Sequence, residues 1–367
     1  MKKTLLALSG AALALASTAA SPAVVYDRDG TTLALGGRVQ ALFFSGSNNY
    51  VENRDATILN NSRLNISGRS QLAPGIAAIG FAEWHAADGD STLNNGLTAR
   101  EQFVGVDFGK FGVLKAGRAY DAAHEVLTVT DIFEEYSVET QSGGADRRPG
   151  TFKYIWEGFG VTAGFSYQAA KNDLQISGGT SSNTFDAEGG VSVLLGYTTP
   201  SVLFGPVSIK AAYSYFEGQN DPGSGSVVDK VKDVDASITW GRFSGLYFAL
   251  VGQQRKFEYN ELGDVDERTV KTVEFAGSYT FDSSLSIRAG YQYKHAEDEL
   301  GSLSATAIQR QIPVYVEYQF SDNFKVFAEA AFDVGSDKNV TGDLAGVSTL
   351  SGRDDSARYS LAARYTF

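Results

Sequence analysis

The sequence of 367 residues is acidic, with a formal net charge of −12, and it is rich in glycine, tyrosine and phenylalanine but has no cysteine. An acidic chain is a poor candidate for binding nucleic acid, which favours basic surfaces. The absence of cysteine fits an exported protein that forms no disulfides. Beyond the N-terminal segment, no apolar run reaches the about 18 residues that a transmembrane helix needs. Abundant aromatic residues and glycine in a chain of polar average composition are typical of a membrane β-barrel.

The N-terminus has the layout of a secretory signal peptide. Two lysines follow the initial methionine, an apolar run occupies 4–16, and small residues come next. A charged start, a short apolar middle and a small-residue cleavage site define such a signal, and the stretch has no polar face that an ordinary surface helix would need. We place cleavage after Ala23, with Ala19 and Ala20 as alternatives, which makes residues 1–23 a removable signal peptide.

The rest of the chain alternates apolar and polar residues with a period of two. In the segment 285–293, the odd positions carry leucine, isoleucine, alanine and two tyrosines, whereas the even positions carry serine, arginine, glycine and glutamine. Segments 207–216 and 324–333 repeat this alternation. The pattern predicts strands with one apolar and one polar face, either in a membrane barrel or in a soluble sandwich.

Three features favour the membrane barrel. The apolar faces end in aromatic residues such as Tyr197, Tyr291 and Tyr318, and aromatic rings prefer the boundary between bilayer and water. Short turns alternate with long polar connections, as in barrels with short periplasmic turns and long external loops. The chain ends on an alternating strand at Phe367, which resembles the signal that outer-membrane barrels present to their assembly machinery.

The number of connections predicts the size of the barrel. Long connections are expected near residues 46–57, 87–98, 119–150, 170–190, 217–231, 257–267, 295–307 and 334–356. Eight long connections imply sixteen strands, and a barrel of that size is wide enough for an aqueous channel. We therefore predict an all-β fold in which residues 24–367 form a single domain, a 16-stranded antiparallel transmembrane β-barrel.

The third connection, 119–150, is long enough to require a functional reason. We expect it to fold inward and narrow the lumen. The acids of its stretch TDIFEE at 130–135 would then be Asp131, Glu134 and Glu135.

Basic residues on the polar faces of the first strands are candidates for the opposite wall. Alternation points Arg38 and Arg63 into the pore, and an arginine facing lipid at mid-depth would cost about 2–4 kcal/mol. On a later strand, placing Arg100 inward sends Glu101 outward, toward lipid or a subunit contact.

In its order of motifs the chain resembles the general, non-specific porins of the Gram-negative outer membrane. The motifs are YDRDG at 26–30, LGGR at 35–38, SRLNISG at 62–68, AREQFVG at 99–105, GRAY at 117–120, TD at 130–131 and the terminal Phe367. The resemblance covers essentially the whole chain after residue 23. It implies a homotrimer of passive channels in the outer membrane, reached by export through the periplasm.

The resemblance also implies roles for individual residues. In that family an aspartate and a glutamate on an inward-folded third loop face a ladder of basic residues across the constriction. Asp131 matches the aspartate and Glu135 the glutamate. The ladder matches Arg38, Arg63, Arg100 and Arg147, with Arg148 as the alternative to Arg147. Arg118 matches an arginine at the root of the loop, which we expect to position the loop.

The tip of the third connection departs from the family pattern. Enterobacterial members often have Pro-Glu-Phe-Gly-Gly, whereas residues 132–135 read IFEE and place Glu134 where the proline would stand. Which glutamate faces the pore is therefore open.

The expected selectivity follows from charged side chains at the constriction of a water-filled pore. Acids facing arginines create a transverse field, and one unit charge at 10 Å in bulk-like water contributes about 0.4 kcal/mol. We expect weak selectivity for ions and small hydrophilic solutes; the acidic chain favours cations and the arginines oppose this. No cofactor is expected. Further expected partners are outer-membrane lipid and lipopolysaccharide.

Other functions are less well supported by the sequence. An enzyme in a barrel needs an arrangement such as Ser-His-Asp, but the chain has only three histidines and no Gly-x-Ser-x-Gly, so we expect no enzymatic activity. The motif at 27–30 resembles the start of a calcium loop but lacks the later acidic ligand, so no metal is expected. A plugged barrel would need a plug segment, and only 119–150 is long enough.

A substrate-selective sugar channel is the closest alternative. It would use a stripe of aromatic side chains along the lumen. The sequence offers no readable continuous path, although six residues could face inward: Tyr120, Phe133, Tyr136, Phe216, Tyr247 and Tyr315.

Overall fold

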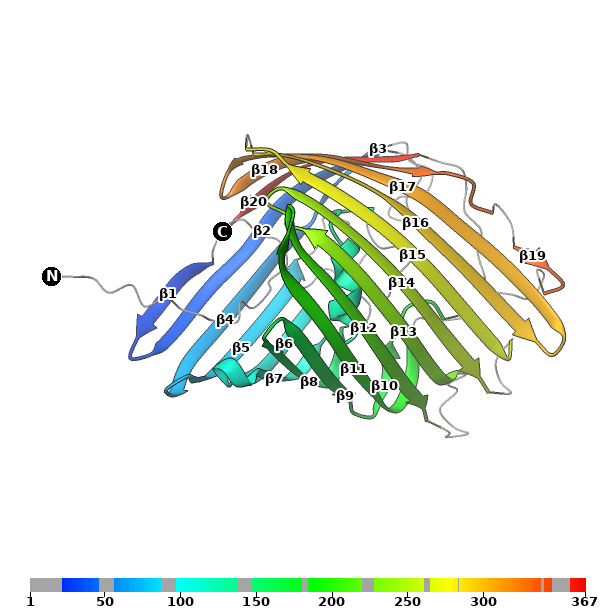
Figure 1. The fold of residues 1–367 in the computed structure, drawn as a ribbon, viewed down its shortest axis with the longest axis horizontal. Helices are drawn as coiled ribbons and strands as arrows, with labels where there is room; N and C mark the ends of the chain where they lie inside the picture. Colours follow the sequence, from blue (N-terminus) through cyan, green and yellow to red (C-terminus); the bar gives the residue numbers. More distant parts are fainter. Residues whose placement is uncertain are drawn as a thin grey trace.

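Antiparallel strands follow one another around a closed barrel in the computed structural model (Figure 1). The structure describes residues 22–45, 56–86, 97–136, 147–179, 184–219, 228–260, 265–282, 284–337, 340–344 and 357–367. The strands are β1 (Ala23–Arg28), β2 (Thr31–Ser45), β3 (Ala56–Asn60), β4 (Ser62–Ala73), β5 (Ile76–Ala86), β6 (Thr98–Asp107), β7 (Val113–Ala119), β8 (Arg148–Gly158), β9 (Val161–Gln168), β10 (Lys171–Gln175), β11 (Thr184–Val202), β12 (Gly205–Gly218), β13 (Val228–Gly241), β14 (Leu246–Tyr259), β15 (Glu267–Thr280), β16 (Leu285–Leu300), β17 (Leu303–Ser321), β18 (Phe324–Asp333), β19 (Thr341–Gly342) and β20 (Arg358–Thr366). The short helices are η1 (Gly109–Phe111), α1 (His124–Leu127) and η2 (Thr128–Thr130).

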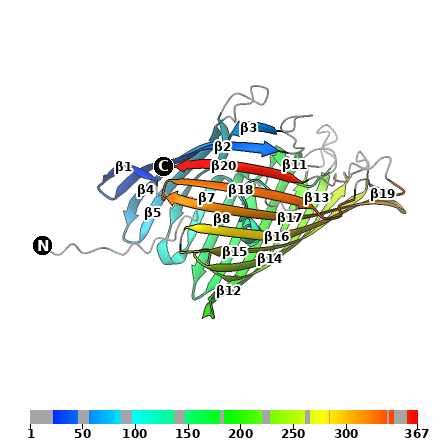
Figure 2. The same ribbon diagram turned by 90° about the horizontal axis from the view of Figure 1, so that it is seen from above.

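Several short strands are parts of one wall strand. β3 and β4 pair with successive parts of β2, and β10 continues β9 along β11. β20 pairs with β2 to close the barrel, and Figure 2 shows these two strands side by side. β1 extends the line of β20 along β2, while β19 adds two pairs at the far end of β17. The wall therefore has sixteen antiparallel strands, which confirms the predicted fold class.

The two faces of the wall have the polarity of a membrane barrel. Outward-facing apolar side chains are exposed, as at Leu195 (64%) and Val234 (57%). Inward-facing polar side chains are buried, as at Gln40 (0%), Glu274 (1%) and Arg364 (1%). Backbone groups are paired between strands all around the ring, which is what a spanning structure in lipid requires.

Aromatic side chains gather at both ends of the apolar outer face. Near the short turns, Tyr279 packs edge to face with Phe281, and Tyr318 packs in the same way with Phe320. At the opposite end, the rings of Phe332 on β18 and Tyr359 on β20 also meet edge to face. These two groups mark the boundaries of the layer that contacts lipid.

Some predicted long connections are continuations of strands. The expected connection 295–307 is a hairpin in which β16 continues to Leu300 and β17 begins at Leu303. Much of 170–190 likewise belongs to β10 and β11. Beyond the lipid layer the outer face of a strand also meets water, so both faces become polar and the sequence resembles a loop.

Parts of the prediction lie outside the described residues. These are 1–21, which hold most of the predicted signal peptide, and parts of seven predicted connections. The parts of the connections are 46–55, 87–96, 137–146, 180–183, 220–227, 261–264 and, in the last connection, 338–339 and 345–356. Ala23 is the first residue of β1. No helix in the described part of the chain is long and apolar enough to span a bilayer.

Candidate functional site

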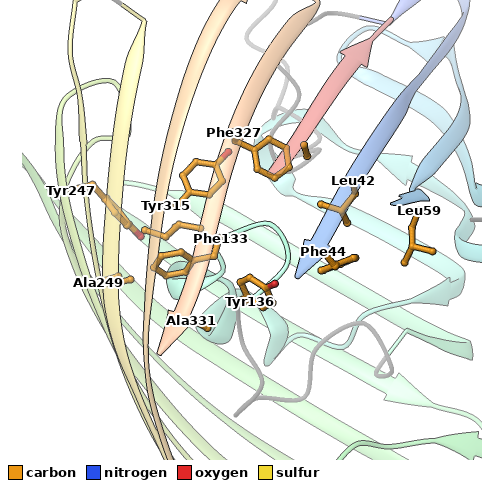
Figure 3. Packing of buried hydrophobic residues seen from close by; sticks show 13 residues of the cluster. Leu42, Phe44, Leu59, Phe133, Tyr136, Tyr247, Ala249, Tyr315, Phe327 and Ala331 are labelled. Atoms are coloured by element: carbon orange, nitrogen blue, oxygen red, sulfur yellow. The ribbon is translucent and has the colours of Figure 1, made fainter. Parts of the chain in front are cut away.

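The third connection packs against the polar face of the distant wall. Its described part, 120–136, contains α1 and η2. Phe133 and Tyr136 are buried in one cluster with Tyr247 of β14 and Tyr315 of β17 (Figure 3). The opposite faces of those strands carry the exposed apolar side chains, so these contacts are on the inner side of the barrel.

A single carboxylate holds the turn at the end of this segment. Glu329 on β18 accepts hydrogen bonds from the backbone N–H groups of Glu134 (3.1 Å), Glu135 (3.0 Å) and Tyr136 (2.7 Å). The backbone from 134 to 136 is thereby fixed to β18.

Three more wall residues bind the connection. Thr130 donates to Glu274 of β15 at 2.7 Å, the Tyr247 hydroxyl donates to the Val129 carbonyl at 2.8 Å, and Arg288 of β16 donates to the Ile132 carbonyl. Four successive contacts with β14, β15, β16 and β18 therefore determine the path of the connection across the lumen.

Glu134 lies among three basic side chains. Arg364 donates to both of its carboxylate oxygens, at 2.8 and 2.6 Å, and Lys325 donates at 2.9 Å. Arg38 approaches to 3.7 Å. Burial alone would raise the pKa of Glu134, but Lys325 and Arg364 outweigh burial and hold this pKa well below its usual range.

Glu135 has a different environment. Its carboxylate accepts a hydrogen bond from Gln40 of β2 at 3.0 Å and makes no ion pair within the described chain. Burial, together with the neighbouring charge of Glu134, raises the pKa of Glu135 to about 7. Glu135 is therefore the acid on this segment whose charge changes near neutral pH.

Four arginines follow one another along the inner wall. Arg38 on β2 and Arg63 on β4 are direct cross-strand neighbours, and Arg100 on β6 is the principal charged neighbour of Arg63. Arg147, just before β8, has Arg100 as its basic neighbour and donates to the Tyr120 hydroxyl at 2.6 Å. The structure thus brings together the four positions of the predicted ladder.

A β-bulge places Arg100 and Glu101 on the same face. The register shifts where β6 pairs with β5, so both residues lie opposite the single residue Glu83. Arg100 forms an ion pair with Glu83, and Glu101 has lysines of β7 and β8 as charged neighbours. The prediction that an inward Arg100 sends Glu101 outward is wrong, because strict alternation ends at a bulge.

Of the other predicted residues, Arg148 and Arg118 lie apart from this ladder, whereas Asp131 is a charged neighbour of Tyr120 together with Arg100 and Arg147. Arg148 is 1% exposed, forms an ion pair with Asp121 and lies over the ring of Phe216 at 4.4 Å. Asp131 is exposed at the end of η2. Arg118 lies in β7, and among the described residues no hydrogen bond or ion pair joins it to the third connection.

Comparison with known proteins establishes the family. A model of the family described as Gram-negative porin matches residues 4–339. The chain is a Gram-negative porin. Outer membrane protein U of Vibrio vulnificus is 28% identical to this porin, and outer membrane porin F of Salmonella typhimurium is 23% identical, each over the full length of both chains. The family recognised in the sequence is confirmed, and the porin is a transport protein of the outer membrane.

Solved structures share the barrel of this porin. Salmonella typhi OmpF in complex with daunomycin superposes with a TM-score of 0.69 at 19% identity, covering 92% of this chain and 98% of that chain. The trimer form of Vibrio cholerae OmpT gives 0.66 at 15% identity, covering 92% and 100%. At these identities the likeness shows the fold.

Three important residues of the porin were missed from the sequence: Lys325, Glu329 and Arg364. All three stand on the polar faces of alternating strands near the C-terminus, opposite lipid-facing residues such as Val326 and Tyr365. The alternation therefore carried the signal for an inward side chain. The missing information was the distance from these strands to the third connection.

Proposed function

We propose that the porin is a passive diffusion channel for ions and small hydrophilic solutes, in which the third connection narrows the lumen and charged side chains give weak selectivity. The supporting observation is the bidentate contact of Glu134 with Arg364, because it joins the third connection to the closing strand beside the arginine ladder. Arg38, Arg63, Arg100 and Arg147 form the basic side of the constriction.

The acidic side of the constriction differs from the family pattern. Glu134 is neutralised by its three basic neighbours and acts mainly as an anchor. Asp131 and Glu135 then supply the acidic side, while Arg63 and Arg147 have no ion pair with an acid among the described residues. Polar solutes align in the field between the two sides. Screening over about 8 Å at physiological salt confines that field to the constriction.

Arg148 and Arg118 take other places in this proposal. Arg148 holds the start of the third connection through Asp121 and does not line the pore. The anchors of the connection are Glu329, Glu274, Arg288 and Tyr247, in place of Arg118.

Conductance in a planar lipid bilayer tests the channel. Open steps with a small reversal potential in a salt gradient are expected, and Arg63→Gln should shift this potential toward cations. Arg242→Gln, in a short turn at the barrel rim, is the matched control that removes an equal charge. Absence of conductance, or an equal shift in both variants, would contradict the proposal.

A sugar-selective channel finds little support in the packing. Phe133, Tyr136, Tyr247 and Tyr315 share a buried cluster that holds the third connection. The ring of Tyr120 is stacked on His124 with centroids 3.5 Å apart. Blockade of the current by one sugar at low concentration would nevertheless favour that alternative.

We further propose that the porin is a homotrimer. A solved relative, OmpT of Vibrio cholerae, is described in a trimer form, and the likeness of fold supports the same assembly here. Analytical ultracentrifugation of the detergent-solubilised porin should give three copies, and channels should close in threes. A single-copy mass with single closures would contradict this assembly.

Export and insertion complete the proposal. Residues 1–23 are removed as a signal peptide, which N-terminal sequencing of the outer-membrane protein would test. Phe367 is the signal for the assembly machinery: its backbone exchanges hydrogen bonds with Gly37 at 2.9 and 3.0 Å, where the barrel closes. Deletion of Phe367 should reduce the inserted fraction.

Lipopolysaccharide is the proposed lipid partner. Lys232 and Lys256 are cross-strand neighbours on the outer face of β13 and β14, toward the ends that carry the long connections. Lys232 forms an ion pair with Glu258 at 2.6 Å and Lys256 with Glu267 at 2.5 Å. Exchange of these carboxylates for the phosphate groups of an outer-leaflet lipid would complete the site. Lys232→Gln with Lys256→Gln should lower the amount of lipopolysaccharide that copurifies, and an unchanged amount would count against this site.

A further inference from the structure

The fourth connection also packs against the inner face of the barrel. After β10 the chain continues through residues 176–179, and the side chains of Leu174 and Ile176 are buried (0% and 1%). They join an apolar cluster with Phe216 of β12, Val231 of β13 and Phe257 of β14. This segment therefore leaves its own strand pair and covers the inner face of the next three strands.

Two arginines hold the backbone of this segment. Arg255 on β14 donates to both carboxylate oxygens of its cross-strand neighbour Asp233 at 2.7 and 2.6 Å, and its remaining terminal nitrogen donates to the Ser177 carbonyl at 2.9 Å. Arg268 on β15 forms the same arrangement with Asp298, at 2.7 and 3.0 Å. Its remaining nitrogen donates to the carbonyls of Gly179 at 2.6 Å and Gly178 at 3.3 Å.

Burial makes the backbone carbonyls essential to these pairs. All four charged side chains are at most 5% exposed. A buried ion pair is tolerated only when its remaining donors are also satisfied. The carbonyls of residues 177–179 meet that need, so the repeated geometry is a specific anchor for this backbone.

The anchor lies at a different depth from the third connection. Along β15, the third connection is bound at Glu274, whereas the fourth is bound at Arg268. The separation is about 20 Å along the strand, toward the end that carries the long connections. Residues 174–179, with the sequence LQISGG, carry no charge, and both arginines that hold them are neutralised by aspartates.

We propose that residues 174–179, named here the sill, form a second narrowing at the outer mouth of the pore, and that Arg255 and Arg268 are positioning residues that set its place. The sill restricts solutes by size, whereas the deeper constriction acts on their charge. This inference rests on the proposed channel function.

Added bulk on the sill tests its place in the pore. The chain has no native cysteine, so Ser177→Cys gives one thiol for methanethiosulfonate reagents of increasing size. Conductance of the full-length channel should fall stepwise with reagent size. Ser201→Cys, exposed at the opposite end of the barrel, is the control and should show no change. Full labelling of the Ser177→Cys channel without loss of conductance would overturn the proposal.

Release of the sill at one of its two anchors tests the role of Arg268. Arg268→Gln combined with Asp298→Asn removes the anchor without changing net charge. Liposome swelling should then become severalfold faster for a trisaccharide relative to a pentose, with the reversal potential unchanged. An unchanged size dependence in a variant that still runs as a folded barrel on an unheated gel would overturn the role of Arg268, as would an altered reversal potential. Failure of the unsubstituted porin to conduct would instead contradict the channel function.

Discussion

Arg364 on the last strand binds Glu134 on the third connection through two parallel hydrogen bonds of 2.8 and 2.6 Å, although the residues are 230 positions apart in sequence. The Nε of Arg364 donates at the same time to Gln40 of β2 at 2.6 Å. One guanidinium thus links the closing seam of the barrel to the segment that crosses its lumen. Its planar set of donors suits this role, which a lysine could not reproduce.

Loss of this link should weaken the barrel. Arg364→Gln removes a bidentate contact, and a hydrogen bond to a charged group contributes about 1.5–3 kcal/mol. We expect a lower midpoint in urea unfolding of the refolded porin and noisier open channels. Glu134→Gln should cost less stability in the Arg364→Gln background than alone, because the bidentate contact is already lost there and only the pairs with Lys325 and Arg38 remain to be broken. A double variant less stable than the sum of both single changes would contradict this coupling.

The charge of Glu135 should make selectivity depend on pH. Burial and the nearby Glu134 raise its pKa from 4.5 to about 7, so its carboxyl is mostly protonated below pH 7 and charged above. The reversal potential should shift toward cations as pH rises through 7, by roughly a factor of two in ion ratio for one charge at 10 Å. Glu135→Gln should abolish that step, and its persistence would assign the titration to another group.

The same raised pKa has a consequence for stability. Between pH 4.5 and 7 the folded porin binds more protons at Glu135 than the unfolded chain does. The contribution of this group to the free energy of unfolding therefore decreases as pH rises through that window. Unfolding midpoints measured across the window should fall less steeply with increasing pH in Glu135→Gln than in the unsubstituted porin.

Removal of the carboxylate on β18 should loosen the third connection. Glu329 accepts three backbone hydrogen bonds, and Glu329→Gln leaves one oxygen for them. Single-channel conductance should rise and fluctuate more. Glu258→Gln, on the outer face of β14, is the matched control. An unchanged conductance in Glu329→Gln would show that the other anchors suffice.

Adjacent arginines should give opposite phenotypes. Arg147 lies by Tyr120 near the ladder, so Arg147→Gln should shift the reversal potential with little effect on stability. Arg148 is buried and paired with Asp121. Arg148→Gln leaves that carboxylate unpaired, so it should destabilise the porin with little effect on selectivity. Reversal potentials and urea midpoints of both variants decide the assignment, and the reverse pattern would exchange the two roles.

The sequence by itself determined the barrel and the direction of most wall side chains. In a strand, successive side chains point to opposite faces, so alternation from one residue to the next placed Arg38 and Arg63 inside and Tyr197 outside. Aromatic ends of apolar faces, alternating connections and the terminal Phe367 are also local features. They require no knowledge of which distant strands meet.

Only the tertiary structure decided how the lumen is occupied. The partners of Glu134 come from β2, β18 and β20, and they are brought together by closure of the barrel. Glu101 points inward because the register of β6 against β5 shifts at this position. The sequence of β6 alone does not reveal that shift. Arg147 and Arg148 have similar local sequence, and their separation follows from what surrounds each one. Contacts across a pore join residues that are far apart in the chain, so local periodicity cannot specify them.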